Sequence, residues 1–101
     1  MSEPVVDPIL GVVQQIVRAA ERSLKLERVF LFGSRARSDA RPESDIDLAF
    51  EHASLDTQWA DFVNEMNERA PTLLSLDLVD LARVDPSLGA RIRREGRVVY
   101  G

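Results

Sequence analysis

The sequence of 101 residues contains no cysteine and only one histidine, His52. Without cysteine the chain has no disulfide framework, no thiol nucleophile and no cysteine-ligated zinc or iron–sulfur site, and one histidine is too few for a histidine-rich metal centre. No apolar run approaches the roughly 20 residues that cross a bilayer. The first residues also lack the basic and apolar regions of a secretory signal. We therefore expect a cytoplasmic protein with no membrane partner.

The chain also has fewer basic residues than acidic ones. Thirteen lysines and arginines face 17 aspartates and glutamates, which gives a net charge of −4. A general nucleic-acid binder usually carries a basic face, so we expect no direct contact with nucleic acid. Lys25 is the only lysine, and the other cations are arginines, whose planar guanidinium suits bidentate contacts with phosphate. With 45% hydrophobic and 30% charged residues, the chain is typical of one globular domain that spans residues 1–101.

Helical and extended patterns alternate along the chain, with a loop or short helix expected from Arg35 to Arg41. Helices are predicted over residues 8–26, with Asp7-Pro8 as N-cap and first turn, 55–70 and 85–94. Strands are predicted over residues 29–32, 45–50, 73–81 and 97–100. This order predicts a two-layer α/β or α+β sheet domain and leaves the strand directions open. In so small a domain the first helix could instead lie at a protein interface.

A turn of small residues follows the buried strand that ends at residue 32. Gly33 lets the backbone approach a ligand closely, and exposed amides at the start of a helix bind phosphate. Ser34 adds a hydroxyl group, and Arg35, Arg37 and Arg41 add cationic donors. The turn is therefore a candidate phosphate-binding site.

Two carboxylates follow on the next predicted strand. Asp45 and Asp47 share one face of that strand, and their Cα atoms are separated by roughly 6.6 Å. Two unpaired aspartates that point the same way repel each other, so Mg²⁺ is their natural companion. A phosphate-binding turn beside a magnesium site is what phosphoryl or nucleotidyl transfer requires.

These residues also carry a family resemblance. Gly33-Ser34, ten residues, and then Asp45-Ile46-Asp47 resemble the signature of the DNA polymerase β-like nucleotidyltransferase superfamily. The fuller strings Gly-Ser-Arg-Ala-Arg and Ser-Asp-Ile-Asp-Leu resemble the minimal nucleotidyltransferases, the MntA-like antitoxins that are paired with HEPN-domain toxins. The resemblance extends to residues 76–81 and 95–100, and so covers nearly the whole chain. It implies an α+β fold with a mixed β-sheet.

The resemblance also implies roles for individual residues. Asp45 and Asp47 would hold two Mg²⁺ ions that bridge the triphosphate of ATP, and Gly33 and Ser34 would hold its β- and γ-phosphates. Asp77 matches a third carboxylate, which ligates the catalytic metal and helps to deprotonate the acceptor hydroxyl. The family reaction transfers AMP to a hydroxyl and releases pyrophosphate. In the MntA-like branch the acceptor is a tyrosine of the HEPN toxin, an RNase that this modification silences, so we expect a hetero-oligomer with that toxin.

Some positions leave alternatives open. Asp80 competes with Asp77, although Asp77 lies in the middle of its predicted strand among apolar neighbours, where an unpaired charge is costly. Ser38 stands where many relatives have glycine, which strains the chain only if this position needs a positive φ. His52 follows the strand that carries the aspartates and is interpreted as a surface loop residue.

The arginines allow two interpretations each. Arg35 and Arg37 either bind phosphate or form ion pairs with Asp39 and Glu43 on a solvated helix. The basic cluster at residues 91–94 is either a solvated helix face or a docking surface for an acidic partner.

Two other functions compete with the adenylyltransferase antitoxin. The same fold could neutralise its toxin by binding alone, with or without an active site. It could also modify a small molecule, as the aminoglycoside nucleotidyltransferases do, but those enzymes usually carry an additional helical domain that this chain lacks.

Overall fold

A computed structural model of the chain describes residues 9–101. The elements are α1 (Leu10–Ser23), β1 (Leu26–Phe32), the short 3₁₀ turn η1 (Gly33–Arg35), β2 (Ile46–His52), α2 (Asp56–Arg69), β3 (Leu76–Asp80), α3 (Pro86–Glu95) and β4 (Arg97–Tyr100). Their order confirms the predicted alternation of helices and strands. The predicted N-cap and first turn at Asp7-Pro8 lie outside the described residues.

Local sequence signals explain where several elements begin and end. The Asp85 carboxylate accepts a hydrogen bond from the Ser87 N–H at 2.9 Å, which caps α3 one residue before Pro86 at its first position. α1 ends earlier than predicted, at Ser23, because Leu24 already has an extended backbone with φ −127° and ψ 155°. The residues after η1 form turns and no further helix.

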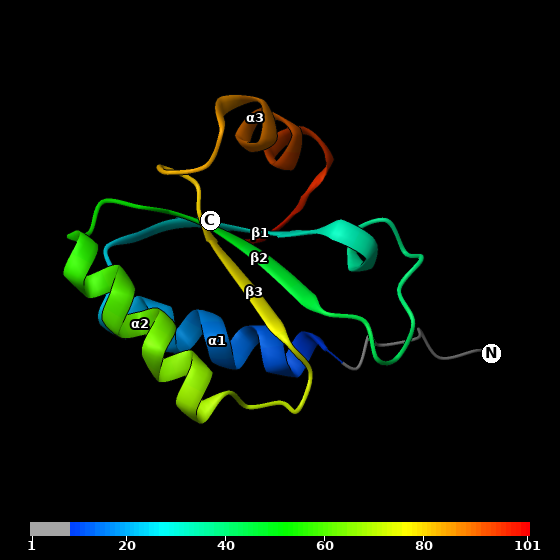
Figure 1. Cartoon of the computed structure of the whole chain (residues 1–101), viewed down its shortest axis with the longest axis horizontal. Coiled ribbons are helices and arrows are strands. Elements are labelled where there is room, and N and C mark those ends of the chain that lie inside the picture. Colours follow the sequence, from blue (N-terminus) through cyan, green and yellow to red (C-terminus); the bar gives the residue numbers. More distant parts are fainter. Residues whose placement is uncertain (1–8) are drawn as a thin grey trace.

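The four strands form one mixed sheet in the order β3-β2-β1-β4 (Figure 1). β1 is antiparallel to both β2 and β4, whereas β2 and β3 are parallel. The parallel pair is possible because α2 makes the long crossover that parallel neighbours require. The strand directions, which the sequence left open, are thereby settled, and the α+β fold class is confirmed.

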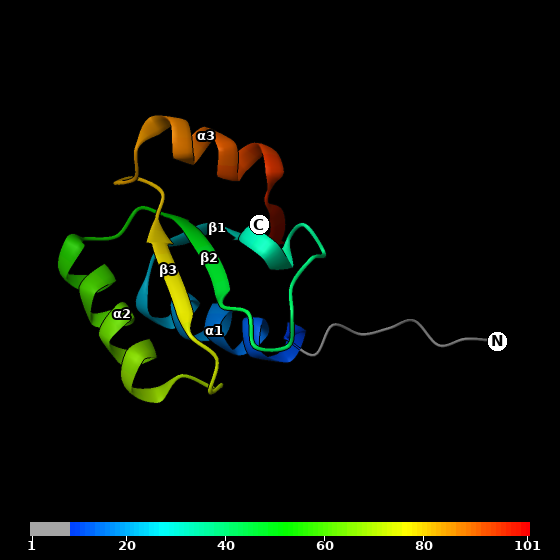
Figure 2. The same cartoon turned by 45° about the vertical axis from the view of Figure 1, so that its right-hand side comes forward.

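Helices cover the two faces of the sheet unequally. α1 and α2 lie side by side on one face, and α3 lies on the other, as Figures 1 and 2 both show. The larger core lies under α1 and α2 and contains Ile46, Leu48 and Phe50 of β2, all fully buried. α1 contributes its own apolar stripe to this core, so burial of that stripe needs no protein interface. Among residues 9–101, no helix is long and apolar enough to span a bilayer.

The opposite face of the sheet carries a smaller core under α3. Phe30 and Ala49 of the sheet pack there with Leu81 and with Ile92 of α3. Successive side chains of a strand alternate between its faces. Since Ile46 and Leu48 point toward α1 and α2, Asp47 points to the face that α3 covers only in part.

Candidate active site

The turn that follows β1 lies against the aspartate-bearing strand. Gly33 opens η1 with a φ of +72°, and a β-carbon at this position would overlap the Asp47 carboxylate. The N–H groups of Ala36 and Arg37 both donate to the Gly33 carbonyl at 3.2 Å and close the turn. Only glycine fits here, because the backbone is left-handed and the carboxylate occupies the space of a side chain.

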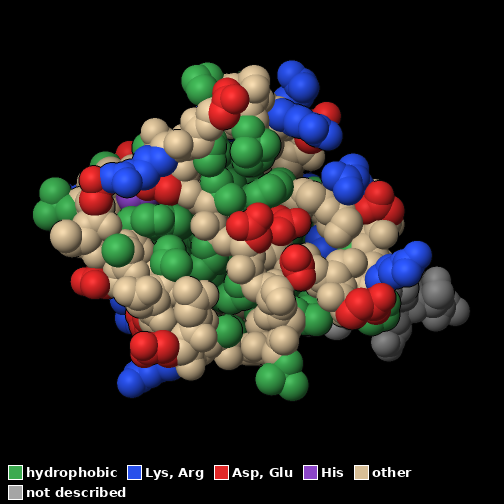
Figure 3. All heavy atoms as spheres, in the orientation of Figure 1, with side chains coloured by type: hydrophobic (Ala, Val, Ile, Leu, Met, Phe, Trp, Pro, Cys, Tyr) green, Lys and Arg blue, Asp and Glu red, His purple; other side chains and the backbone are tan. Residues whose placement is uncertain are grey.

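The sheet register brings the predicted carboxylates of Asp47 and Asp77 together. Asp47 of β2 is the direct partner of Asp77 in the parallel strand β3, and neighbouring strands lie about 4.8 Å apart. Asp45 immediately precedes β2 and contributes a third negative charge. Asp45 and Asp77 are exposed, whereas Asp47 is half-buried. In Figure 3, acidic side chains gather near the middle of this face, next to a hydrophobic patch.

These charges change the acidity of Asp47. Burial raises the pKa of Asp47 above its ordinary value of 3.8, and the nearby Asp77 and Asp45 carboxylates raise it further. Arg37 and Arg35 oppose the shift in pKa but do not cancel it. The site therefore has an excess of negative charge, which a cation would offset.

The donor set fits a magnesium ion that is shared with a phosphate ligand. Within residues 9–101, no three histidine, aspartate or glutamate side chains converge into a ready-made metal cage. Mg²⁺ does not need one, because it usually binds one or two carboxylates and completes its octahedron with water and substrate phosphates. Asp45, Asp47 and Asp77 provide hard oxygen ligands of this kind, and the absence of a side chain at Gly33 lets the Asp47 carboxylate lie directly against the turn.

Asp80, the competing third carboxylate, lies elsewhere and is buried. Its Oδ1 accepts a hydrogen bond from the Ala82 N–H at 3.0 Å and lies 3.3 Å from Nε2 of His52. Arg83 approaches its other oxygen at 3.9 Å. Asp80 therefore ends β3 as a turn residue, while Asp77 stands beside Asp47. Asp77 is also more solvated than its apolar neighbours in sequence suggested, because β3 is an edge strand.

The interpretation of His52 as a surface loop residue is wrong. His52 is the last residue of β2, and its side chain is only 4% exposed. Its ring stacks on Trp59, with ring centroids 5.1 Å apart and an interplanar angle of 13°. Its Nδ1 accepts a hydrogen bond from the Ser54 N–H at 3.2 Å, which directs Nε2 toward Asp80. The sequence could not reveal this burial, because Trp59 and Asp80 lie on other elements.

The two arginines of the turn have different surroundings. Arg35 is buried, and its Nη2 donates to the carbonyls of Arg41, Pro42 and Ser44 at 3.4, 3.3 and 2.8 Å. This guanidinium therefore holds the loop between η1 and β2, and the role of Arg35 as a phosphate ligand stays a prediction. Arg37 is exposed, and its Nε lies 3.4 Å from Asp39.

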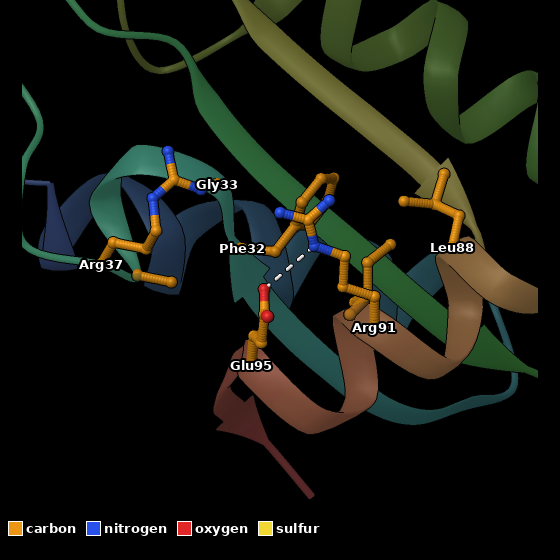
Figure 4. Close-up of a pocket in the computed structure, with 8 residues that line it drawn as sticks. Phe32, Gly33, Arg37, Leu88, Arg91 and Glu95 are labelled. Carbon is orange, nitrogen blue, oxygen red and sulfur yellow. Dashed lines mark hydrogen bonds and ion pairs between the residues drawn. The ribbon is translucent and has the colours of Figure 1, made fainter.

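Ser38 and α3 add two features that were not decided by the sequence. Ser38 has a φ of +65°, so the position where many relatives have glycine does require the left-handed region. A hollow opens between η1 and α3, lined by Phe32, Gly33 and Arg37 on one side and by Leu88, Arg91 and Glu95 on the other (Figure 4). No motif in the sequence indicates that α3 lies beside the turn.

Comparisons with known proteins agree with this geometry. Residues 14–101 match the family described as polymerase beta, nucleotidyltransferase. No protein with a curated function matches the sequence. A protein described as a minimal nucleotidyltransferase is 26% identical, with a TM-score of 0.63 over 87% of this chain and 93% of that one.

Two chains of toxin–antitoxin complexes have the same fold. One, from a crystal structure with AMP-PNP, is 23% identical, with a TM-score of 0.71 over 87% of this chain and 72% of its own length. The other, from an MntA-HepT complex, is also 23% identical, with a TM-score of 0.60 over 89% of this chain and 70% of that one. Because the family match covers most of the sequence and the sheet, the chain belongs to the polymerase β-like nucleotidyltransferases.

Proposed function

We propose that this nucleotidyltransferase is a Mg²⁺-dependent adenylyltransferase antitoxin. Its substrate would be ATP, and its acceptor a tyrosine hydroxyl of a HEPN-family RNase toxin with which it forms a hetero-oligomer. The observation that carries the proposal is the position of Asp47, which contacts the Gly33 turn on one side and pairs with Asp77 on the other. A phosphate-binding turn and a magnesium-binding set of carboxylates thus adjoin on one open face.

The roles follow from these positions. Asp45 and Asp47 would hold two Mg²⁺ ions together with the triphosphate, and Asp77 would complete the site of the catalytic ion. When bound, Mg²⁺ offsets charge on the phosphates and on the leaving pyrophosphate. The Gly33-Ser34 turn, with Arg37 nearby, would hold the β- and γ-phosphates. Arg35 would hold this turn in place through its hydrogen bonds to three carbonyls of the following loop.

The proposed transfer of AMP needs no reactants other than ATP and the acceptor hydroxyl. The acceptor oxygen attacks the α-phosphorus of ATP, the bond from that phosphorus to the bridging oxygen breaks, and pyrophosphate leaves. Asp77, exposed beside Asp47, is the carboxylate that can take the proton of the attacking hydroxyl. The products are an AMP ester of the acceptor and pyrophosphate.

An acceptor that belongs to a second protein is supported by the exposure of the site. Asp45 and Asp77 are exposed, and within residues 9–101 no element encloses the face beside them. A separate protein can therefore bring a hydroxyl to the metal site. The toxin–antitoxin complexes that share this fold agree with such a partner.

The test is to incubate the chain with ATP labelled at the α-phosphate, Mg²⁺ and its cognate HEPN-family toxin. We expect a covalent AMP adduct on the toxin and none with the Asp45→Asn/Asp47→Asn double variant. The matched control is Asp61→Asn/Glu68→Gln, which removes two exposed charges from α2 and should label normally. Labelling by the Asp45/Asp47 variant would overturn the assigned roles. Equimolar neutralisation of the toxin by that variant, without label, would show that binding and not catalysis inhibits the toxin.

A further inference from the structure

β3 carries Asp77 at an edge of the sheet, and its position depends on one neighbouring strand. Within the described sheet β3 pairs only with β2, and that pairing sets Asp77 directly opposite Asp47. Burial and then the Asp77 carboxylate raise the pKa of Asp47, because the two charges repel each other. Like charges directly opposite on neighbouring strands destabilise the pair. Contacts elsewhere along β3 therefore have to hold the strand against this repulsion when no cation is bound.

The last residue of β3 makes such a contact. Asp80 ends the strand, and its side chain is only 7% exposed. Its Oδ1 lies 3.3 Å from Nε2 of His52, which is the last residue of β2. Nε2 is buried, and no described residue meets it in hydrogen-bond geometry, so its attraction to the Asp80 carboxylate is electrostatic. A buried carboxylate is costly without a partner of this kind.

Two further contacts fix the His52 ring in this orientation. The Ser54 N–H donates to Nδ1 at 3.2 Å, so a neutral ring carries its proton on Nε2, the nitrogen that lies beside Asp80. The ring also stacks on Trp59 of α2, with centroids 5.1 Å apart. His52 cannot turn away from Asp80 without losing both contacts. It therefore joins the end of β2 to the end of β3.

Arg83 also approaches Asp80, but it holds this carboxylate less firmly. Its Nε lies 3.9 Å from Asp80 Oδ2, and its Nη2 pairs with Asp56 at the start of α2. The Arg83 side chain is 57% exposed, and exposed ion pairs contribute little to stability. His52 makes the shorter contact and is shielded from solvent, where electrostatic attraction is stronger.

We propose that His52 is a positioning residue for the metal site: by holding Asp80 it keeps β3 in register, so that Asp77 stays beside Asp47. It acts at a distance, because three residues of extended strand, about 10 Å, separate Asp77 from Asp80. A bound cation removes the repulsion between the carboxylates, so His52 affects the affinity for Mg²⁺ more than the rate at saturating Mg²⁺. This inference rests on the proposed function, because it assumes that Mg²⁺ binds at these carboxylates.

The test compares Mg²⁺ binding with stability in the full-length protein. His52→Phe keeps a ring that can stack on Trp59 but removes both nitrogens, whereas His52→Gln restores a donor toward Asp80. Val13→Ala is the control for a loss of stability alone, because Val13 is buried beside β4, at the opposite edge of the sheet from β3. Calorimetry measures Mg²⁺ binding in the presence of AMP-PNP, and transfer of labelled AMP is measured at saturating Mg²⁺. Both use a temperature at which thermal melting shows that every variant is folded.

We expect His52→Phe to weaken Mg²⁺ binding by about threefold or more, while AMP transfer at saturating Mg²⁺ stays near the wild-type rate. His52→Gln should bind Mg²⁺ more tightly than His52→Phe, and Val13→Ala should bind it as the wild type does. Asp80→Asn should weaken binding as His52→Phe does, and the double variant should be no weaker than either.

Three results would overturn the positioning role: unchanged Mg²⁺ binding in His52→Phe, equal weakening in Val13→Ala, or additive losses in the double variant. The proposed function fails in a different way. A wild-type chain that binds no Mg²⁺ with AMP-PNP, or that transfers no AMP, would overturn the proposed function itself.

Discussion

Gly33 and Asp47 lie in contact across the end of β1 and the start of β2, so closely that a β-carbon on residue 33 would overlap the carboxylate. The rest of η1, the loop of residues 36–45 and the first residue of β2 separate them in sequence. Their contact joins the phosphate-binding type of turn to the acidic strand, and it makes Gly33 part of the shape of the site as well as of the turn.

Replacement of Gly33 by alanine should therefore damage both stability and ligand binding. A left-handed φ of +72° costs an L-residue about 1–2 kcal/mol, and the Asp47 side chain must also move. We expect Gly33→Ala to lower the free energy of unfolding by about 2 kcal/mol, measured by urea denaturation, and to abolish Mg²⁺-dependent nucleotide binding. Gly11→Ala is the control, because a β-carbon there meets no atom within 4 Å. In helix α1 that change should leave stability equal or raise it by up to about 1 kcal/mol.

Because the pKa of Asp47 is raised, ionisation of this carboxyl should lower the free energy of unfolding at neutral pH. Because the folded state holds the Asp47 proton more tightly than the unfolded state does, the free energy of unfolding falls as pH rises from about 3.8 through the higher folded pKa. At pH 7 in EDTA, Asp47→Asn should therefore stabilise the protein, by about 0.5 kcal/mol after allowance for solvent screening. At pH 3 the difference should shrink, since the wild-type carboxyl is then protonated. Added Mg²⁺ should stabilise the wild type and leave the variant unchanged; a variant that is less stable at pH 7 in EDTA contradicts the argument.

Substitutions of Asp77 and Asp80 should have different effects: the change at Asp80 should lower stability, and the change at Asp77 should abolish activity. Asp80 is buried and contacts His52, Arg83 and the Ala82 N–H, so Asp80→Ala should cost about 1–3 kcal/mol in thermal or urea unfolding. Asp77→Asn changes an exposed residue of an edge strand and should alter stability by less than about 0.5 kcal/mol. It should nevertheless abolish transfer of labelled AMP. The assignment of the third carboxylate fails if Asp77→Asn transfers AMP at the wild-type rate.

Arg35 should stabilise the loop and Arg37 should not. Arg35→Ala removes the donor to three backbone carbonyls of residues 41–44 and should cost about 1–3 kcal/mol. Limited proteolysis should then cut the loop between η1 and β2 faster than in the wild type. Arg37→Ala removes only an exposed ion pair with Asp39 and should change stability by less than about 1 kcal/mol. Equal protease resistance of the wild type and Arg35→Ala would argue against the supporting role of Arg35.

Replacement of Ser38 by glycine should stabilise the protein slightly. Its φ of +65° is accessible to glycine without strain, although glycine also makes the unfolded chain more flexible. Ser38→Gly should therefore raise the free energy of unfolding by about 0.5 kcal/mol. The matched change Ser87→Gly lies inside α3, where the backbone is helical, and should lower stability. Opposite signs in these two variants are the expected result of differential scanning calorimetry.

Local patterns in the sequence predicted much of the fold. The alternation of Ile46, Leu48 and Phe50 with Asp45 and Asp47 indicated that both aspartates leave the core together, and these three apolar residues are fully buried. The spacing from Gly33-Ser34 to Asp45-Ile46-Asp47 indicated the family, which the match over residues 14–101 confirms. These features depend on neighbours along the chain, so the sequence alone was enough to determine them.

Contacts between distant segments were decided only by the tertiary structure. The parallel register places Asp77, and not Asp80, opposite Asp47, and packing against Trp59 buries His52. The carbonyls of residues 41–44 draw Arg35 inward, and the position of α3 forms the hollow. The alternation of side chains along a strand assigns each one to a face of the sheet. Its neighbours on that face depend on how separate strands and helices pair and pack.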